Sequence, residues 1–228
     1  MDRHFDTSLK ELKQQLVGMA GHVEKAIDIA AEVLSRRDPK LIDEIFKAET
    51  EINQRHVSID NASVTLLALQ QPLAADLRLI VAVLKMNTDL ERMGDQATNI
   101  AYALRELISR HTFKPPKDLL EMFNQAKFMV REALDAFVQQ SPALAQDVLQ
   151  RDDAVDALKS KIFNDTVKLM KADAAQIDDG LGIVLIARNL ERIGDHATNI
   201  AEDVIFATTG KDIRHGYTPE KLREALKP

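Results

Sequence analysis

The sequence contains no cysteine and no tryptophan, and only 4% of its 228 residues are aromatic. Without cysteine there can be no disulfide framework and no thiolate metal site. A core must therefore be filled by Leu, Ile, Val, Ala and Met, a composition that suits helical bundles. Glycine and proline are also scarce, at 8 and 7 residues, which favours long helices over a turn-rich β fold.

Long hydrophobic runs and an excess of positive charge are missing as well. No apolar stretch approaches the roughly 18 residues of a membrane span, so membrane contact would go through a partner. The net charge of −6 argues against non-specific binding to nucleic acid. The N-terminus does not resemble a signal peptide. The absence of cysteine agrees with a reducing compartment such as the cytosol.

One stretch of the sequence occurs twice. Residues 90–101 and 190–201 match at ten of twelve positions, differing only at 93/193 and 96/196. Such a near-copy at an offset of 100 residues indicates an internal duplication. Apolar residues flank both copies at helical spacing and no proline interrupts them, so both are predicted to be helical.

Each copy carries two carboxylates on one helical face. Glu91 and Asp95 are four residues apart, as are Glu191 and Asp195. Like charges at this spacing destabilise a helix. Each pair therefore needs compensation, either from a cation or from the arginine beside each glutamate.

Apolar periodicity and turn residues divide the chain into six predicted helices. The helix starts are marked by Ser8 with Glu11, Asp38-Pro39, Ser141-Pro142 and Asp173 with Gln176. Pro115-Pro116 marks a linker. The predicted helices cover about 8–35, 38–70, 73–110, 118–139, 141–171 and 174–207.

The two sets of three helices predict an all-α protein made of two pseudo-symmetric three-helix bundles, because short loops place neighbouring helices antiparallel. The first bundle is assigned to residues 1–112 and the second to 113–210. A tail of residues 211–228 contains a short helical run to Leu226. The alternative is a single six-helix array without separate cores.

Several segments resemble the PhoU family of phosphate-signalling proteins. These are the duplicated Leu-Glu-Arg-Met/Ile-Gly-Asp, the segment Gln71–Arg78 that opens the third helix, and Lys211–His215. The resemblance covers nearly the whole chain. It implies a cytoplasmic, usually dimeric regulator that restrains phosphate uptake and the phosphate-starvation response. The implied partners are the ATPase subunit of the phosphate ABC transporter and a membrane sensor histidine kinase.

The resemblance also implies multinuclear metal sites, because some members bind iron or zinc clusters through pairs of Glu/Asp-x-x-x-Asp motifs. One motif of each pair comes from the middle helix of a bundle. Aligning Ile52 with Val155 assigns these middle-helix positions. The candidate metal ligands are Glu49, Asn53, Glu91 and Asp95 in the first half, and Asp152, Asp156, Glu191 and Asp195 in the second.

The second candidate set is complete, whereas the first has a neutral asparagine where a carboxylate is expected. Four carboxylates on facing helices repel one another unless they are protonated or bridged by cations. Oxygen ligands suit hard cations such as Mg²⁺, Ca²⁺, Mn²⁺ or Fe³⁺. The competing interpretation is a solvated acidic face, with Glu91 and Glu191 paired to arginines.

Other residues of the motifs have simpler roles. Gly94 and Gly194 are predicted to allow close helix approach. Structural ion pairs are expected for four arginines, with a partner contact or a phosphate oxyanion as the alternative. These arginines are Arg78, Arg92, Arg188 and Arg192. The six histidines show no ligand spacing, and most are expected on the surface.

Three functions compete at this point. The first is a regulatory adaptor without turnover. The second is a di-metal carboxylate enzyme, which uses Glu-x-x-His pairs; the sequence contains none. The third is a metal store or structural bundle. The absence of a P-loop, a Gly-rich phosphate cradle and a nucleophile elbow makes enzyme interpretations weak.

Overall fold

The computed structural model describes residues 3–110 and 114–214, which form six long helices and two short 3₁₀ turns. The 3₁₀ turns, Pro39–Leu41 and Ala174–Gln176, precede α2 and α6. Within the described residues there is no β-strand, and the predicted all-α fold is confirmed. The helices are α1 (Arg3–Arg36), α2 (Ile42–Gln70), α3 (Ala74–Ile108), α4 (Lys117–Gln139), α5 (Pro142–Ala172) and α6 (Ile177–Thr209).

The helix starts agree with the sequence in three cases and disagree in one. Ser8 lies inside α1, which already begins at Arg3, so the predicted capping box at this position is wrong. Asp38, Ser141 and Asp173 each accept a backbone hydrogen bond from the turn that follows. Asp38 and Asp173 cap the 3₁₀ turns, however, so α2 and α6 begin one turn later than predicted. The predicted helical run to Leu226 lies outside the described residues.

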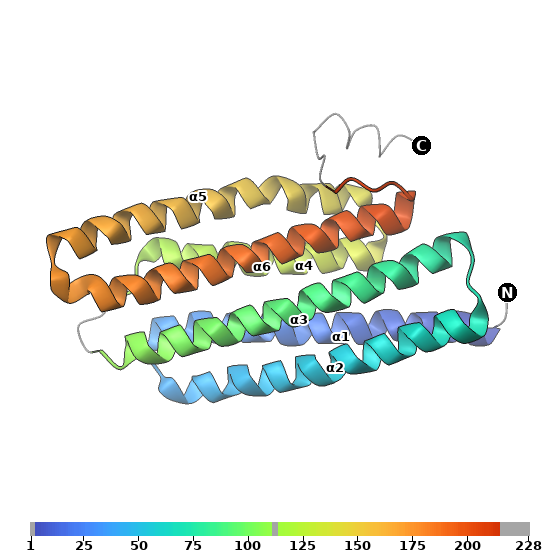
Figure 1. Cartoon of the computed structure of the whole chain (residues 1–228), viewed down its shortest axis with the longest axis horizontal. Helices are drawn as coiled ribbons and strands as arrows, with labels where there is room; N and C mark the ends of the chain where they lie inside the picture. Colours follow the sequence, from blue (N-terminus) through green and yellow to red (C-terminus); the bar gives the residue numbers. More distant parts are fainter. Residues whose placement is uncertain (1–2, 111–113, 215–228) are drawn as a thin grey trace.

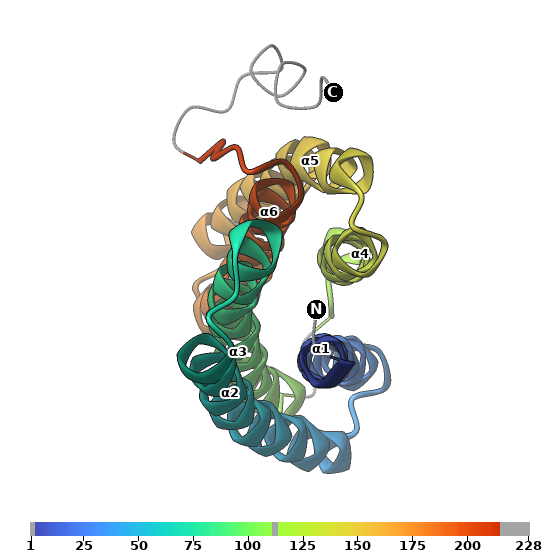
Figure 2. The same ribbon diagram turned by 90° about the vertical axis from the view of Figure 1, so that its right-hand side faces the viewer.

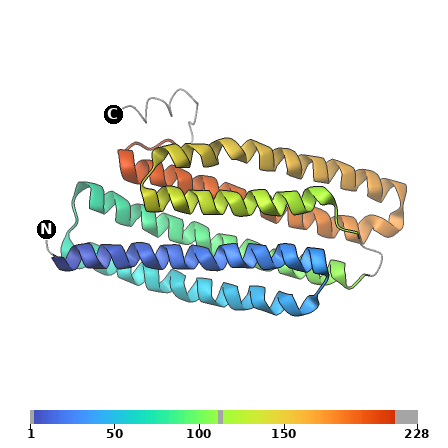
Figure 3. The same ribbon diagram turned by 180° about the vertical axis from the view of Figure 1, so that it is seen from behind.

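The helices form a curved layer with two helices on its concave side. Figure 2 shows α5, α6, α3 and α2 side by side in the layer, with α1 and α4 to the right of it, inside its curve. Figure 1 looks at the outer face of the layer, and Figure 3 shows α1 and α4 from the opposite side. α3 and α6 run antiparallel along the middle and pack against each other, as α1 and α4 do. The duplicated stretches therefore meet at the seam between the two halves.

The buried side chains of both halves form one continuous hydrophobic cluster. Four apolar residues that recur every three or four positions along α1 are at most 1% exposed: Leu12, Leu16, Met19 and Val23. The boundary between the halves at 112/113 stays a prediction. No helix in the described part of the chain combines the length and hydropathy that a membrane span requires.

Candidate functional site

The two duplicated stretches have the same burial pattern on α3 and α6. Glu91 and Glu191 are partly buried, Asp95 and Asp195 are exposed, and the glycine between each pair is buried. This agreement follows from the shared sequence, because the same apolar residues turn the same helical face toward the core. Each acidic pair thus lies beside the middle helix of its own half.

The glycines are points of close contact with those middle helices. A Cβ added at Gly94 would lie 3.1 Å from Ile52 Cδ1, and one added at Gly194 would lie 3.6 Å from Val155 Cγ1. The predicted close approach is confirmed at Gly94, whereas a Cβ at Gly194 would fit at an ordinary contact distance. Ile52 and Val155 occupy equivalent places, as the alignment of the two halves predicts. The added Cβ at Gly194 would also lie 3.7 Å from Asp152 Oδ1.

The second half brings its candidate carboxylates close enough together to raise the pKa of two of them, Asp152 and Asp195. Burial, and then the charges of Asp195 and Asp156, raise the pKa of Asp152 to about 6. Burial and the nearby Glu191 and Asp156 also raise the pKa of Asp195. Both shifts mean that the negative charges here are incompletely compensated within the protein. We name the residues Asp152, Asp156, Glu191 and Asp195 the second acidic row.

Lys159 on α5 provides the compensation that is present. Its Nζ donates a hydrogen bond to Glu191 Oε1 at 2.8 Å. This bond raises the pKa of Lys159. Arg92 and Arg192, the residues expected to compensate the glutamates, form no ion pair with any described residue, so that expectation is wrong.

The first half has weaker electrostatics at the corresponding place. Asn53 Nδ2 donates a hydrogen bond of 2.7 Å to Glu49 Oε1, so these neighbours on α2 satisfy each other. Glu91 and Asp95 have no hydrogen bond or ion pair from their side chains within the described residues. We name Glu49, Asn53, Glu91 and Asp95 the first acidic row. It has three carboxylates and one amide, and carries less charge than the second row.

The donor chemistry of the second acidic row fits a hard cation, because all four side chains offer carboxylate oxygens. The geometry is not preformed, since the described residues contain no group of three or more His, Asp or Glu side chains arranged to hold a metal ion. Lys159 would have to release Glu191 for a cation to engage all four. Metal binding therefore stays a prediction for both rows.

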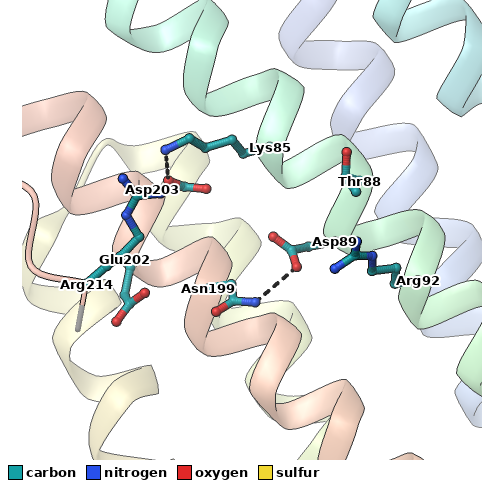
Figure 4. A pocket seen from close by; sticks show the side chains of 8 residues that line it. All are labelled: Lys85, Thr88, Asp89, Arg92, Asn199, Glu202, Asp203 and Arg214. Carbon is teal, nitrogen blue, oxygen red and sulfur yellow. Dashed lines mark hydrogen bonds and ion pairs between the residues drawn. The ribbon is translucent and has the colours of Figure 1, made fainter.

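A buried polar contact across the seam was not foreseen from the sequence. His196 Nδ1 lies 2.8 Å from Asp89 Oδ1. Asn199 Nδ2 donates to the same oxygen at 3.1 Å (Figure 4). His196 is 7% exposed, so it is not one of the histidines that lie on the surface. The sequence does indicate that His196 has a separate role, because 96/196 is one of the two positions at which the duplicated stretches differ. Position 89 likewise has an aspartate where 189 has an asparagine.

These residues adjoin a polar pocket of about 510 Å³ between α3 and α6 (Figure 4). Lys85 Nζ donates to Asp203 Oδ1 at 3.0 Å across it. Burial raises the pKa of Asp203, and the hydrogen bond from Lys85 opposes that shift. Arg92 and Arg214 also line the pocket. Positive and negative side chains balance here, so the pocket has no strong preference for an anion.

The other arginines also depart from expectation. Arg188, like Arg92 and Arg192, forms no ion pair within the described residues. The Nε of Arg78 is buried without a hydrogen bond. The structural ion pairs expected for these four residues are therefore absent from the described part of the chain, and three of the guanidinium groups remain free for an external partner.

The fold and the duplicated motifs define a class of helical proteins built from two equivalent three-helix units. The PhoU domain family matches residues 16–104 and 119–204, one match in each half. The chain belongs to the PhoU family.

Individual relatives agree over almost the whole chain. The phosphate-specific transport system accessory protein PhoU homologue of Clostridium acetobutylicum is 36% identical over 92% of this chain and 96% of its own length. The homologue of Pseudomonas aeruginosa is 37% identical over 94% of this chain and 89% of its own length.

Solved structures show the same architecture. The crystal structure of PhoU from Pseudomonas aeruginosa has a TM-score of 0.87 at 36% identity, covering 91% of this chain and 100% of that one. The phosphate transport system regulatory protein PhoU from Streptococcus pneumoniae has a TM-score of 0.85 at 29% identity, covering 91% and 98%.

Proposed function

We propose that this protein is a cytoplasmic negative regulator of phosphate uptake and of the phosphate-starvation response. It acts as an adaptor between the phosphate ABC transporter, through its ATPase subunit, and the sensor histidine kinase. The observation that carries this proposal is the similarity, over more than nine-tenths of the chain, to accessory proteins of phosphate-specific transport. A role in phosphate transport regulation follows from that similarity, and "accessory" implies a role other than catalysis.

The shape of the molecule supports an adaptor. The helices run the length of the molecule and expose long continuous faces (Figure 1). Arg92, Arg188 and Arg192 are exposed and form no ion pair within the described residues, so they are available to acidic groups of a partner. An adaptor needs such surfaces and needs no reaction centre.

We further propose that the second acidic row holds a hard cation and that the first row binds one more weakly. Asp152, Asp156, Glu191 and Asp195 would be the ligands, and Lys159 the group that leaves on binding. The bound ion supplies positive charge that neutralises the row. Loss of that negative charge from one face changes the affinity of this face for a charged partner.

The proposal is tested in a strain whose own PhoU-family gene is deleted. The gene for this protein should restore repression of phosphate uptake and of a phosphate-starvation reporter at high phosphate. Affinity capture from the same cells should recover the transporter ATPase and the sensor kinase. A fully expressed, folded protein that restores neither repression nor capture would contradict the adaptor role.

The contribution of metal is tested separately with Asp152→Asn, Asp156→Asn, Glu191→Gln and Asp195→Asn combined. If this variant loses metal and partner capture together, the cation belongs to the mechanism. If it loses metal and keeps full capture and repression, the cation does not. The competing role of a metal store predicts stoichiometric metal in the wild type with no captured partner at all.

A further inference from the structure

The polar pocket between α3 and α6 lies at one end of the seam, and the duplication supplies an equivalent end for comparison. That other end holds a hollow of about 210 Å³ with leucines of both helices in its lining. Residues 100 positions apart correspond, so the counterparts of the charged pocket residues can be read from the sequence. Lys85, Asp89, Glu202 and Asp203 correspond to Leu185, Asn189, Tyr102 and Ala103. These four charges are therefore specific to one end.

The charges are not needed to bring the two helices together. At the other end α3 and α6 still approach closely, since a Cβ added at Gly182 would lie 2.8 Å from Leu107 Cγ. In the pocket, by contrast, two carboxylates are buried, with Asp203 4% and Asp89 8% exposed. Replacing a buried ion pair by apolar residues is often neutral or stabilising. Buried charges at one end of a duplicated seam therefore favour a role in binding over a role in packing.

The buried side of the pocket presents two carboxylate oxygens that can accept further hydrogen bonds. Lys85 Nζ donates to Oδ1 of Asp203, and His196 and Asn199 contact Oδ1 of Asp89. Within the described residues, no hydrogen bond reaches the second oxygen of either carboxylate. Figure 4 shows these two oxygens turned toward each other across the gap between the helices. Such a pair of acceptors fits a positively charged group with several donors, such as a primary ammonium.

The open side of the pocket presents a cation that can bind an acid. Arg92 is exposed, lines the pocket and lies three residues after Asp89 on α3. Opposite charges at this spacing attract each other on a helix. Arg92 nevertheless forms no ion pair with Asp89 or with any other described residue. The guanidinium of Arg214, which also lines the pocket, is engaged by Asp212. A ligand that joins Asp89 to Arg92 would therefore satisfy both charges.

We propose that this pocket binds a small zwitterion, a primary amine that also carries a carboxylate or phosphate group. The ammonium group donates hydrogen bonds to the free oxygens of Asp89 and Asp203, and the acid group accepts hydrogen bonds from Arg92. The pocket volume of about 510 Å³ is within the range of small-molecule sites. Balanced charges give no strong preference for a simple anion, but they complement a ligand that carries both charges.

The ligand would contact both halves of the chain, α3 through Asp89 and Arg92 and α6 through Asp203. Because it binds the folded protein, it should also raise the midpoint of thermal unfolding. This inference does not depend on the role in phosphate regulation, since every measurement below uses the purified protein alone.

Isothermal titration tests the class of ligand. β-Alanine and phosphoethanolamine share the same ethylamine part and differ in the acid group, whereas methylamine, acetate and inorganic phosphate each carry one kind of charge. We expect saturable binding of at least one zwitterion, with each single-charge probe bound about tenfold more weakly or less, because a charged hydrogen bond is lost. The tighter zwitterion identifies the acid group. No saturable binding of either zwitterion, or a single-charge probe bound equally well, would overturn the proposal.

Arg92→Gln and Arg192→Gln form a matched pair of variants at equivalent positions. Both arginines are exposed and form no ion pair within the described residues, so neither change should disturb the fold. Arg92→Gln should raise the dissociation constant of the bound zwitterion by about tenfold or more, because it removes a charged donor. Arg192→Gln should leave that constant unchanged. An equal effect of the two variants, or none for Arg92→Gln, would contradict the assigned pocket.

Asp203→Asn tests the ammonium end, since it keeps an acceptor for Lys85 but removes the negative charge. It should also weaken zwitterion binding by about tenfold or more. Amide chemical shifts of the wild-type protein give an independent measurement that does not require this variant to fold. Addition of the bound zwitterion should shift signals of residues 85–92 and 199–203 most strongly. Shifts confined to other parts of the chain would overturn the proposal.

Discussion

The two acidic rows share a motif but differ in electrostatics. Around Gly94, the first row has an asparagine that bonds its own neighbour, Glu49, at 2.7 Å. Around Gly194, the second row has four carboxylates, and the pKa of Asp152 is raised to about 6 by burial and by the other acids. The stretches 90–101 and 190–201, which carry the acidic residues of the last helices, are nearly identical, so the difference comes from the middle helices, α2 and α5. A duplicated motif therefore does not establish a duplicated site, because half of each row lies on a helix that has diverged.

The largest expected difference is in cation affinity. Asp152→Asn with Asp195→Asn should weaken binding of Mn²⁺ or Mg²⁺ to the tighter site on the order of 100-fold or more, because two of four charged ligands are lost. Glu91→Gln with Asp95→Asn should leave that site unchanged. Isothermal titration of the metal-free proteins measures both. Equal losses in the two variants would show that the rows are equivalent.

The difference between the two acidic rows should become smaller when a fourth carboxylate is introduced into the first row. Asn53→Asp should raise cation affinity there by about tenfold, since a neutral donor becomes a carboxylate. It also removes the hydrogen bond to Glu49 and should lower stability without metal. The control is Asp156→Asn, which makes the reverse change at the equivalent position and should reduce affinity in the second row. If Asn53→Asp leaves binding unchanged, the missing charge is not what separates the rows.

The repulsion among the carboxylates of the second acidic row should appear in the pH dependence of the free energy of unfolding when no metal is bound. The pKa of Asp152 is about 6 in the folded protein and 3.8 in the unfolded chain, so the folded state holds the proton more tightly. This group's contribution to stability is complete below pH 3.8 and is lost as the pH rises through 6. Asp152→Asn should therefore be more stable than wild type at pH 7.5, by about 1 kcal/mol after allowing for its partial exposure.

Urea unfolding in the presence of a chelator, repeated from pH 4 to 8, measures this difference in the free energy of unfolding. The gain should shrink to near zero at the acidic end of that range. Asp147→Asn, at an exposed position of the same helix whose charge is not among those that raise the pKa of Asp152, serves as the control. A variant that is less stable than wild type at pH 7.5 would show that Asp152 is already compensated.

The smallest expected effect concerns the two glycines. Alanine in a helix interior is favoured over glycine by about 1 kcal/mol. Gly194→Ala has room, with its nearest neighbour at 3.6 Å, and should be stabilising by up to that amount. Gly94→Ala would press on Ile52 at 3.1 Å and should gain little or nothing. Thermal unfolding of both variants decides whether the middle helices really approach the two copies differently.

Most of the fold follows from local sequence signals. The apolar periodicity and the prolines place all six helices, and the cap at Ser141 starts α5 as predicted. The helix start predicted at Ser8 was wrong, because the same residue pattern as a capping box can occur inside a helix that begins earlier. The apolar periodicity could not predict the continuous core. It shows which face of a helix is buried, but not which other helix packs against that face.

The candidate site was only partly predictable for the same reason. Matching the two halves placed Ile52 and Val155 beside the glycines, because contacts within a repeat are inherited from the duplication. The contacts of His196 with Asp89 and of Lys159 with Glu191 depend on how two helices are set against each other. The spacing of residues within one helix does not reveal how that helix is positioned along its neighbour. Both contacts nevertheless involve positions where the halves differ, so comparing the repeats can direct attention to them.

Paramagnetic broadening by Mn²⁺ tests the central claim, that the second row holds a hard cation in preference to the first. Amide resonances of the metal-free protein are followed at well below one equivalent of Mn²⁺, because a bound paramagnetic ion broadens only nearby signals. The account predicts that signals around Asp152, Asp156, Glu191 and Asp195 disappear first, while those around Glu49 and Asp95 persist. Simultaneous loss around both rows, or broadening at neither, would contradict it.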